Sequence, residues 1–294
     1  MVYIIIPVFN RINLTKNCLL LLEKQTISNI HIIVIDDGSK DKTSQMVQNE
    51  FPKVELIQGT GSWYWTGSVY KGVEKALTLS KSNNDYILML NDDLEFSPNL
   101  IQNLINFSIQ HPKSIVQALG SWTNQPKIIQ YAGMKINWWT AKGSFPHKDV
   151  LREKFSSTHF EPSDTLTGRG VLFPIQVFRQ VGNYDRRIIH RGDPELTRRA
   201  AKAGWNLFVY FGAVVFSVPV KGKGNINEQK CYHLANLKEY YFGSLSSSHI
   251  PTLWRNSCSY THSKIQAFIF FSCTLARHSV HFIKNLYFNP KEKK

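Results

Sequence analysis

The sequence predicts an α/β fold in which a mostly parallel, doubly wound sheet is flanked by helices and followed by a helical tail. Short runs of β-branched and apolar residues alternate with longer segments of helical periodicity over residues 1–112. The apolar runs lack polar alternation, which is typical of strands covered on both faces. The chain has 294 residues, of which 43% are hydrophobic, so it can bury a large core.

The strands and helices of this first part alternate regularly. Strands are predicted at residues 2–6, 32–35, 54–57 and 86–90. Apolar residues that recur every three or four positions predict helices near residues 13–22, 41–51, 68–77 and 97–105. Asn13 has the residue type of a helix N-cap, and Ser97 with Pro98 has the types of an N-cap and a first helical residue.

Beyond residue 112 the pattern is less regular. Residues 128–146 have the composition of short strands and turns. A helix that starts with proline is predicted at 174–180, and another within 190–205, where Gly204 has the residue type of a C-terminal stop.

Polar loops follow three of the predicted strands, at residues 7–10, 36–39 and 91–93. Ligands of such sheets bind beyond the carboxyl ends of the strands, so three loops at this rim indicate a binding site. Phe9 in the first loop can stack on a base or pack on the core, and the sequence leaves both open.

Two pairs of adjacent carboxylates follow the second and fourth strands, Asp36 with Asp37 and Asp92 with Asp93. Such pairs can cap helices and be solvated at turns, or gather to hold a cation. Two pairs at one rim favour the cation, and hard oxygen ligands suit Mg²⁺ or Mn²⁺.

The chain is basic, with 35 Lys and Arg against 21 Asp and Glu, a formal charge of +14. This charge indicates a polyanionic partner, such as nucleic acid, anionic lipid or a phosphorylated substrate, or else a solubilising surface. The acidic rim argues against nucleic acid. No GxGxxG follows the first strand, which argues against a dinucleotide-dependent oxidoreductase.

Four cysteines, at positions 18, 231, 258 and 273, show no CxxC spacing. We expect free thiols in a reducing compartment, without a disulfide framework or a zinc site built on cysteine pairs. Met1 is followed directly by an apolar run with no basic leader, so the expected location is cytoplasmic.

Six stretches occur in an order that resembles family 2 glycosyltransferases of the GT-A fold. They are IIIPVFNR, HIIVIDDGSKDKT, GTGSWYWTGSVYKGVEKAL, YILMLNDDLEF, LTGRGVLFPIQVFRQVGNYD and GDPELTRRAAKAGW, within residues 2–212. The tryptophan-rich loop is most similar to members that build bacterial surface polysaccharides, rhamnosyltransferase-like proteins among them.

The resemblance implies a nucleotide site at the rim. Phe9 would lie against the base, and Asp36 or Asp37 would accept a hydrogen bond from uracil or thymine. NDD stands where the family has its DXD-type motif, so Asp93 would be the direct metal ligand. Asp92 would contact the ribose or sugar and would be the second candidate metal ligand. The other residues implied for this nucleotide site are Pro7, Asn10, Gly61 and Trp65.

The resemblance also implies the catalytic base, Asp193 in GDPEL. An N-cap of the following helix, with Pro194 as its first residue, is the structural alternative and is compatible with a base. Arg198 or Arg199 falls at the family's basic position one helical turn further on. The residues implied for sugar and acceptor binding are Trp63, Gly168, Arg169, Gly192 and Arg198.

The chain departs from the family at one point. Many members supply a later histidine as a metal ligand, but the corresponding stretch here reads VVFSVPVKGKGN. Waters would then complete the metal shell, or Lys221 or Lys223 would contact the diphosphate. His190 and His233 are spare candidates for a ligand.

The implied activity is inverting, Mg²⁺- or Mn²⁺-dependent transfer of a sugar from a UDP- or dTDP-linked donor. The acceptor would be a hydroxyl of a glycan or lipid-linked saccharide in capsule, O-antigen or similar synthesis. A non-catalytic nucleotide- or glycan-binding module on the same fold is the alternative. The implied catalytic domain spans residues 1–225, with a nucleotide-sugar half at 1–112 and an acceptor half at 113–225.

Residues 226–294 are expected to form a helical extension rich in basic and aromatic residues. Its apolar run within 264–288 is far shorter than the ~20 residues that span a membrane. Aromatics mixed with basic residues suit a helix that lies in the membrane plane, at the cytoplasmic face, and packing on the catalytic domain or on a second subunit is the alternative. An oligomer is compatible with either.

Overall fold

The computed structural model describes residues 1–189, 192–219 and 233–288. Its first part contains β1 (Val2–Val8), α1 (Ile12–Glu23), β2 (Ile30–Asp36), α2 (Thr43–Glu50), β3 (Glu55–Gln58), α3 (Tyr64–Leu79), β4 (Tyr86–Met89), β5 (Leu94–Phe96) and α4 (Leu100–Gln110). The middle part contains β6 (Ser114–Trp122), β7 (Gln125–Tyr131), β8 (Lys135–Ile136), β9 (Gly143–Ser144), η1 (Arg152–Lys154), β10 (Phe160–Pro162), β11 (Val171–Pro174), α5 (Ile175–Val181), α6 (Gly192–Lys202) and β12 (Asn206–Ser217). The last part contains η2 (Leu234–Asn236), α8 (Leu237–Phe242), α9 (Ile250–Tyr260) and α10 (Lys264–Phe288).

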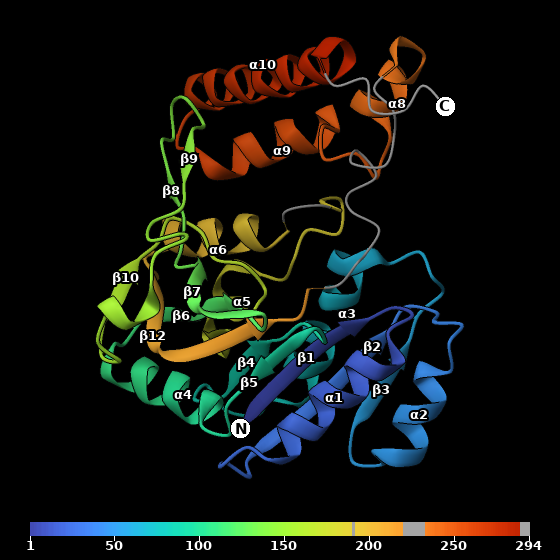
Figure 1. Ribbon diagram of the computed structural model, residues 1–294, viewed down its shortest axis with the longest axis vertical. Helices are drawn as coiled ribbons and strands as arrows, with labels where there is room; N and C mark the ends of the chain where they lie inside the picture. The colour runs from blue at the N-terminus through green and yellow to red at the C-terminus, as the bar shows by residue number, and fades with distance from the viewer. Residues whose placement is uncertain (190–191, 220–232, 289–294) are drawn as a thin grey trace.

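Within these residues one mixed sheet runs through both predicted halves of the catalytic domain, with helices on both faces (Figure 1). Its main path has the order β10-β12-β6-β11-β4-β1-β2-β3. The first-half strands β3, β2, β1 and β4 are parallel, whereas β11 runs antiparallel between β4 and β6. The carboxyl ends of β1, β2 and β4 therefore meet at one rim, as the sequence predicts.

Strand β1 lies in the centre of the parallel part and is buried on both faces. Alternate side chains point to opposite faces of a strand, so Ile5 joins one core cluster while Ile4 and Ile6 join the other. All three are fully buried, and each such side chain stabilises the fold by about 1.5–3 kcal/mol. The continuous apolar run thus results from helices on both sides.

Helix α3 packs close to the sheet because Gly72, which has no side chain, faces β1 and β2. A Cβ at this position would lie 2.6 Å from Cγ2 of Ile5 and 2.7 Å from Cδ1 of Ile35. This close contact holds α3 against β1 and β2.

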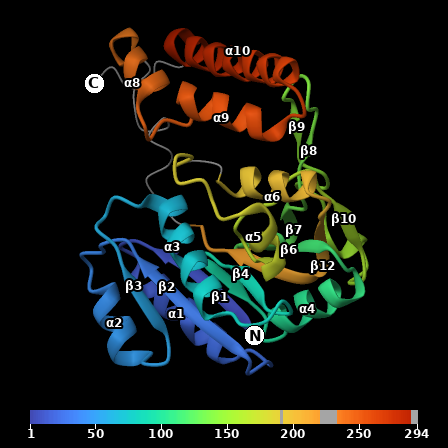
Figure 2. The ribbon, with the colours of Figure 1, turned by 180° about the vertical axis from the view of Figure 1, so that it is seen from behind.

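The C-terminal helices form a layer of their own. Helices α9 and α10 lie side by side, and α6 lies between them and the sheet (Figure 2). The hydroxyl of Tyr240 donates to the carbonyl oxygen of His278 at 3.0 Å, which ties α8 to α10. Both terminal nitrogens of Arg277 donate to the turn between β8 and β9, to Thr140 O and Ala141 O at 2.7 Å each.

The predicted strands are present within a few residues, and the expected tail is helical where it is described. Helix starts are less accurate. Helix α1 begins at Ile12 rather than after Asn13, and α4 begins only at Leu100, because Ser97 and Pro98 first form a turn closed by Leu100 N–H and Ser97 O at 3.1 Å. Gly204 has φ +94° and ends α6 as predicted. The predicted boundary at residue 225 falls outside the described residues.

Candidate active site

The loops after β1 and β2 are joined to each other at the rim. The backbone N–H of Asn10 donates to Oγ of Ser39 at 2.8 Å, and its side-chain oxygen accepts from Lys40 N at 2.7 Å. Asn10 has φ +53°, a conformation that asparagine tolerates better than most residues. Phe9 beside it is 52% exposed, so its ring is available on the rim, and Pro7 behind it is half-buried in β1.

Asp36 and Asp37 both hold backbone in place. Asp36 is 1% exposed and accepts from Ser39 N at 2.9 Å and from the Ser44 hydroxyl. Asp37 accepts from the N–H groups of Gly61, Trp63 and Tyr64, each at 2.8 Å. Asp37 thus satisfies N–H groups at the start of α3 that have no helical partner. A nucleobase at this place would have to donate to lone pairs of the two carboxylates that these hydrogen bonds do not occupy.

The tryptophans in the first turn of α3 have different surroundings. Trp63 is half-buried and packs over Gly59 and Gly67. The indole N–H of Trp65 donates to Oδ1 of Asn91 at 3.2 Å, and its ring meets Tyr184 edge-on at 5.9 Å. Trp65 therefore connects the loop after β4 with the segment before α6.

Arg11 lies between the two carboxylates that follow β4. Its Nη1 is 3.0 Å from Oδ1 of Asp92 and 3.3 Å from Oδ2 of Asp93. Asp92 is nearly buried and also accepts from Thr15 Oγ1 at 3.2 Å, whereas the Asp93 side chain is 21% exposed. Burial raises the pKa of Asp92 to about 6, although Arg11 opposes the rise.

Asp92 and Asp93 are therefore suited to different roles. Both oxygens of Asp92 are engaged inside the fold, which suits it to orienting the loop. The partly exposed Asp93 offers a hard oxygen at the rim. Mg²⁺ is usually bound by one or two carboxylates plus substrate phosphates. The residues present therefore fit such an ion with Asp93 as its protein ligand.

No third acidic or histidine donor joins Asp92 and Asp93 among the described residues. Lys221, Lys223 and His190 fall outside those residues. His233 is exposed just before η2.

Asp193 is the second residue of α6 and is held from outside the helix. Its Oδ2 accepts from the Gly168 N–H at 2.9 Å, and its Oδ1 accepts from the Tyr184 hydroxyl at 2.9 Å. Burial raises the pKa of Asp193 to about 7, although Gly168, Tyr184 and Arg169 each oppose the rise. The carboxylate bonds to two other segments, so the N-cap alternative does not describe it.

Gly168 and Gly192 allow close contacts around this carboxylate. A Cβ at Gly168 would lie 2.6 Å from Cζ2 of Trp65 and 3.1 Å from Oδ1 of Asp193. A Cβ at Gly192 would lie 3.1 Å from Oγ1 of Thr66. Both glycines thus act through packing, and neither position leaves room for a side chain without a shift.

The three arginines near Asp193 have different tasks. Arg169 is exposed, and its charge is felt at Asp193. Arg198 stacks 3.9 Å from the centre of the Trp138 ring, and its Nε donates to Tyr260 O at 2.9 Å, so it binds the C-terminal layer. Arg199 donates to Asn183 O at 3.0 Å, which supports the segment that carries Tyr184.

A cleft of about 710 Å³ opens between the region of Asp193 and the C-terminal helices. Thr165, Thr167 and Pro194 form the wall next to Asp193. The opposite walls combine aromatic and basic side chains from the β7–β9 region and the C-terminal helices: Tyr131, Lys142, Phe145, Tyr240, Tyr260, Phe270, Arg277, His278 and His281.

Sequence reasoning missed Arg11 and Tyr184 as members of the site. Both lie in stretches that carry the resemblance, VFNR and GNYD, so their neighbourhood was a signal. Of the predicted residues, the structure brings Trp65, Gly168 and Asp193 together, and joins the loops of Asn10, Asp37 and Gly61 along the rim. It turns Arg198 toward the C-terminal layer.

Comparisons with known proteins agree with this arrangement. Residues 3–166 match the family described as glycosyl transferase family 2. An uncharacterized glycosyltransferase of Rickettsia typhi is 27% identical over 251 residues, which cover 82% of this chain and 69% of that protein. The N-acetylglucosaminyl-diphospho-decaprenol L-rhamnosyltransferase of Mycobacterium tuberculosis is 23% identical over 198 residues, or 62% of this chain and 64% of that protein.

Among solved structures, GalNAc-T7 with UDP, GalNAc and Mn²⁺ superposes with a TM-score of 0.61 at 14% identity. The match covers 99% of this chain and 58% of that chain. It confirms the predicted fold class. The family match covers more than half of the chain and confirms the resemblance seen in the sequence. The chain therefore belongs to glycosyl transferase family 2 and is a glycosyltransferase with the GT-A fold.

Proposed function

We propose that this glycosyltransferase is inverting and metal-dependent. It would move a sugar from a UDP- or dTDP-linked donor to a hydroxyl of a glycan or lipid-linked saccharide in bacterial surface polysaccharide synthesis. The observation that carries the proposal is Asp193, a carboxylate held by two hydrogen bonds, with a pKa raised to about 7, next to a cleft that opens beside Pro194.

The donor would bind along the rim of β1, β2 and β4. The exposed ring of Phe9 offers a face on which a uracil or thymine can stack, worth about 1–3 kcal/mol in other base-binding proteins. Asp36 or Asp37 would accept the base N–H, with Pro7, Asn10, Gly61 and Trp65 shaping the pocket. Asp92 orients the loop beside the ribose or sugar. UDP in the GalNAc-T7 structure supports a uridine donor.

Asp93 would hold Mg²⁺ or Mn²⁺ together with the donor diphosphate. When bound, such an ion offsets the negative charge of the leaving diphosphate. Arg11 would pair with Asp93 alongside the ion, and its charge offsets the repulsion between the carboxylates of Asp92 and Asp93. Arg169, exposed on the same side as Asp193, supplies further positive charge.

Asp193 would act as the general base. A pKa near 7 leaves a substantial ionised fraction at neutral pH and gives the carboxylate more driving force than an ordinary aspartate. Each oxygen already accepts one hydrogen bond, which fixes the orientation of its remaining lone pairs. As the acceptor oxygen bonds to the anomeric carbon, its proton passes to Asp193 and the carbon–diphosphate bond breaks on the opposite face. The configuration is thereby inverted.

The acceptor would lie in the cleft between α6 and the C-terminal helices. Trp63, Gly168, Arg169 and Gly192 would take part in sugar or acceptor binding. Aromatic rings such as Tyr131 and Phe145 can stack on sugar rings, and Lys142 can meet a phosphate group. The relative from M. tuberculosis is named for an acceptor that joins a sugar to a lipid through a diphosphate, which supports a lipid-linked substrate.

The outer side of α10 would rest on the cytoplasmic face of a membrane that holds such a lipid. Among the described residues, no helix is both long and apolar enough to cross a membrane. Exposed apolar side chains nevertheless recur along one side of α10: Ile265, Phe268, Ile269, Val280, Ile283 and Tyr287. Lys264 and Lys284 flank them, a pattern typical of helices that lie in the interface.

A catalytic role is separated from a non-catalytic binding module by one substitution. We would incubate the protein with a panel of nucleotide sugars and Mn²⁺ or Mg²⁺, and measure donor turnover and thermal protection. Asp193→Asn should lower turnover by about 10²–10⁴-fold and keep nucleotide protection. Glu95→Gln, which neutralises an exposed carboxylate on β5, is the control and should retain full turnover.

Unchanged turnover in Asp193→Asn would remove the base assignment. Nucleotide binding without any turnover by the unmodified protein would favour the binding module. Indifference of turnover to EDTA would argue against Asp93 as a metal ligand.

A further inference from the structure

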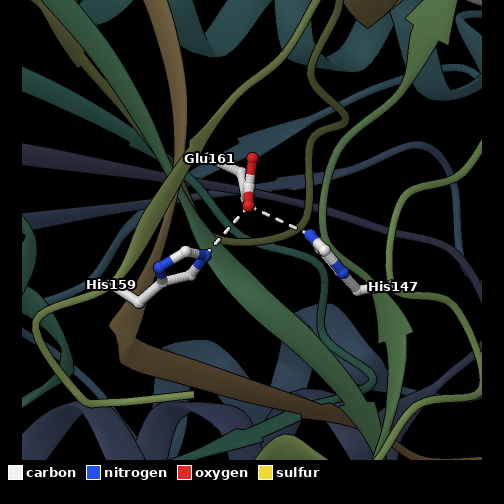
Figure 3. A group of neighbouring side chains, drawn as sticks. All are labelled: His147, His159 and Glu161. Atoms are coloured by element: carbon white, nitrogen blue, oxygen red, sulfur yellow. Dashed lines mark hydrogen bonds and ion pairs between the residues drawn. The ribbon is translucent and has the colours of Figure 1, made fainter. Parts of the chain in front are cut away.

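Two histidines and a glutamate meet at the edge of the sheet, away from the rim acids. His147 lies in the turn after β9, His159 directly precedes β10, and Glu161 lies within β10 (Figure 3). Strand β10 is the edge strand and pairs with β12 at Phe208–Tyr210, whereas the carbonyl oxygen of Asp93 accepts from Val218 N–H beyond the far end of that strand. A strand rises about 3.3 Å per residue, so the two places are separated by roughly 25 Å along β12.

The three side chains converge on one point. Nε2 of His147 lies 3.0 Å and Nε2 of His159 lies 2.9 Å from the same carboxylate oxygen, Oε1 of Glu161. Within the described parts of the chain, this is the one group of three His, Cys, Asp or Glu donors that lie within 4.8 Å of one another. The side chains are 24–34% exposed, which leaves a solvent-facing side for a further ligand.

The surrounding chain holds the imidazoles in place. Phe155 and Phe211 pack against His159, with ring centres 5.1 and 4.7 Å away, and Phe155 also meets His147 at 4.7 Å. The backbone N–H of Val150 donates to the carbonyl oxygen of His147 at 3.1 Å and closes the turn that carries this histidine. The His159 carbonyl accepts from Phe211 N–H at 3.0 Å, so the backbone itself is anchored to β12.

We infer that His147, His159 and Glu161 form a binding site for a divalent transition-metal ion, zinc in the first place. Two imidazole nitrogens and one carboxylate are a donor set that zinc uses with a water as fourth ligand. Donors about 2.0–2.1 Å from a tetrahedral ion are about 3.3 Å apart, so the two nitrogen–oxygen spacings of 3.0 and 2.9 Å need to open by only a few tenths of an ångström, and the two imidazole nitrogens already lie within 4.8 Å of each other.

The ion has a structural task here. Residues 137–159 contain little regular structure, and the site ties the turn at His147 to the edge strand. Phe145, two residues before His147, lines the cleft that we assign to the acceptor. A metal at His147 therefore steadies a wall of that cleft, whereas the ion at Asp93 belongs to the donor. This last consequence rests on the proposed function, but metal binding itself does not.

The test uses the full-length protein with any affinity tag removed and after treatment with a chelator. Zinc content after addition of Zn²⁺ and dialysis is measured by mass spectrometry, and unfolding is followed by circular dichroism. We expect one zinc per chain at this site and a rise of melting temperature of about 5 °C when zinc is at a hundred times its Kd. His147→Ala, His159→Ala and Glu161→Gln should each lose both effects.

Two controls separate this site from other metal binding. Asp93→Asn should keep the zinc and the shift in melting temperature. His31→Ala removes a histidine of similar exposure that pairs with Glu55 at 2.8 Å, and should also keep both. If an alanine variant fails to fold, the zinc content and melting temperature of Glu161→Gln, which preserves a hydrogen-bond acceptor, test the inference. Equal zinc content in wild type and in all three site variants, or none in wild type, would overturn the inference.

Discussion

The hydroxyl of Tyr184 donates a 2.9 Å hydrogen bond to Oδ1 of Asp193. Tyr184 is buried, and burial next to Asp193 raises its own pKa, so it remains a neutral donor. A donor stabilises the charged carboxylate and opposes the rise in pKa that burial causes. Tyr184 is therefore a positioning residue that sets both the orientation and the proton affinity of the proposed base.

Tyr184→Phe should move the pH dependence of the reaction. Without the hydrogen bond the pKa of Asp193 rises above about 7, so the acid limb of kcat/KM shifts to higher pH. A shift of about one pH unit would lower kcat/KM about tenfold on that limb and leave the plateau less affected. Tyr70→Phe removes the hydroxyl of a half-buried tyrosine on α3 and should leave the profile unchanged. An unmoved acid limb in Tyr184→Phe would remove this role.

Ionisation of the Asp193 carboxyl group should also lower the stability of the folded protein at high pH. Its pKa rises from 3.8 to about 7 in the fold, so the folded state holds the proton more tightly than the unfolded state. The stability that this gives is complete below pH 3.8 and is lost as pH rises through about 7. Asn cannot ionise, so Asp193→Asn should melt several degrees above wild type at about pH 8, with a gap that closes toward about pH 4. A gap independent of pH would contradict this.

The sequence predicts the rim because strand order and polar loops are local features. Phe9, Asp36 and Asp93 each follow an apolar strand, and parallel pairing alone brings their loops together. The bonds of Arg11 to Asp92 and Asp93 join residues more than 80 positions apart. No local pattern contains such a pairing.

Arg198, on the same helix as Asp193, likewise has partners that the local sequence does not predict. Its spacing on α6 is consistent with a site residue, but α9 and Trp138 provide its partners, and their placement depends on the whole fold. No sequence motif predicts the site of His147, since His159 and Glu161 are two residues apart at the edge strand and His147 comes from a separate loop.

Arg11→Gln should lower the stability of the metal-free protein and increase the stabilisation that a bound metal ion gives. Removing one partner of a buried ion pair costs about 3–5 kcal/mol, and about 1–3 kcal/mol is expected here because Arg11 is 38% exposed. The uncompensated carboxylates should then gain more from a cation. Thermal unfolding with and without Mn²⁺ measures both effects, and Lys16→Gln on the same helix is the control. Equal Mn²⁺ shifts in wild type and Arg11→Gln would contradict this.

Gly168→Ala should reduce turnover strongly because the new methyl group meets Trp65 and Asp193 together. Its Cβ would lie 2.6 Å from Cζ2 and 3.0 Å from Cη2 of Trp65, and these atoms belong to the six-membered ring of the indole. We expect a loss of stability of about 1–3 kcal/mol and a lower kcat. Trp65→Phe removes those ring atoms, so the double variant should recover part of the stability that Gly168→Ala loses. Additive losses in the two single variants would show that the clash lies elsewhere.

The exposed side of α10 should bind anionic membranes. Phe268 is 62% and Ile265 is 72% exposed, and Lys264 and Lys284 flank this surface. Each basic residue near an anionic surface adds about 1 kcal/mol, so sedimentation with vesicles that contain anionic lipid should exceed that with neutral vesicles and fall at high salt. Ile265→Ser with Phe268→Ser should release the protein, whereas Ile109→Ser, at a 64% exposed position on α4, should not. If the double variant sediments like wild type but changes its molar mass in light scattering, the surface instead joins two copies of the chain.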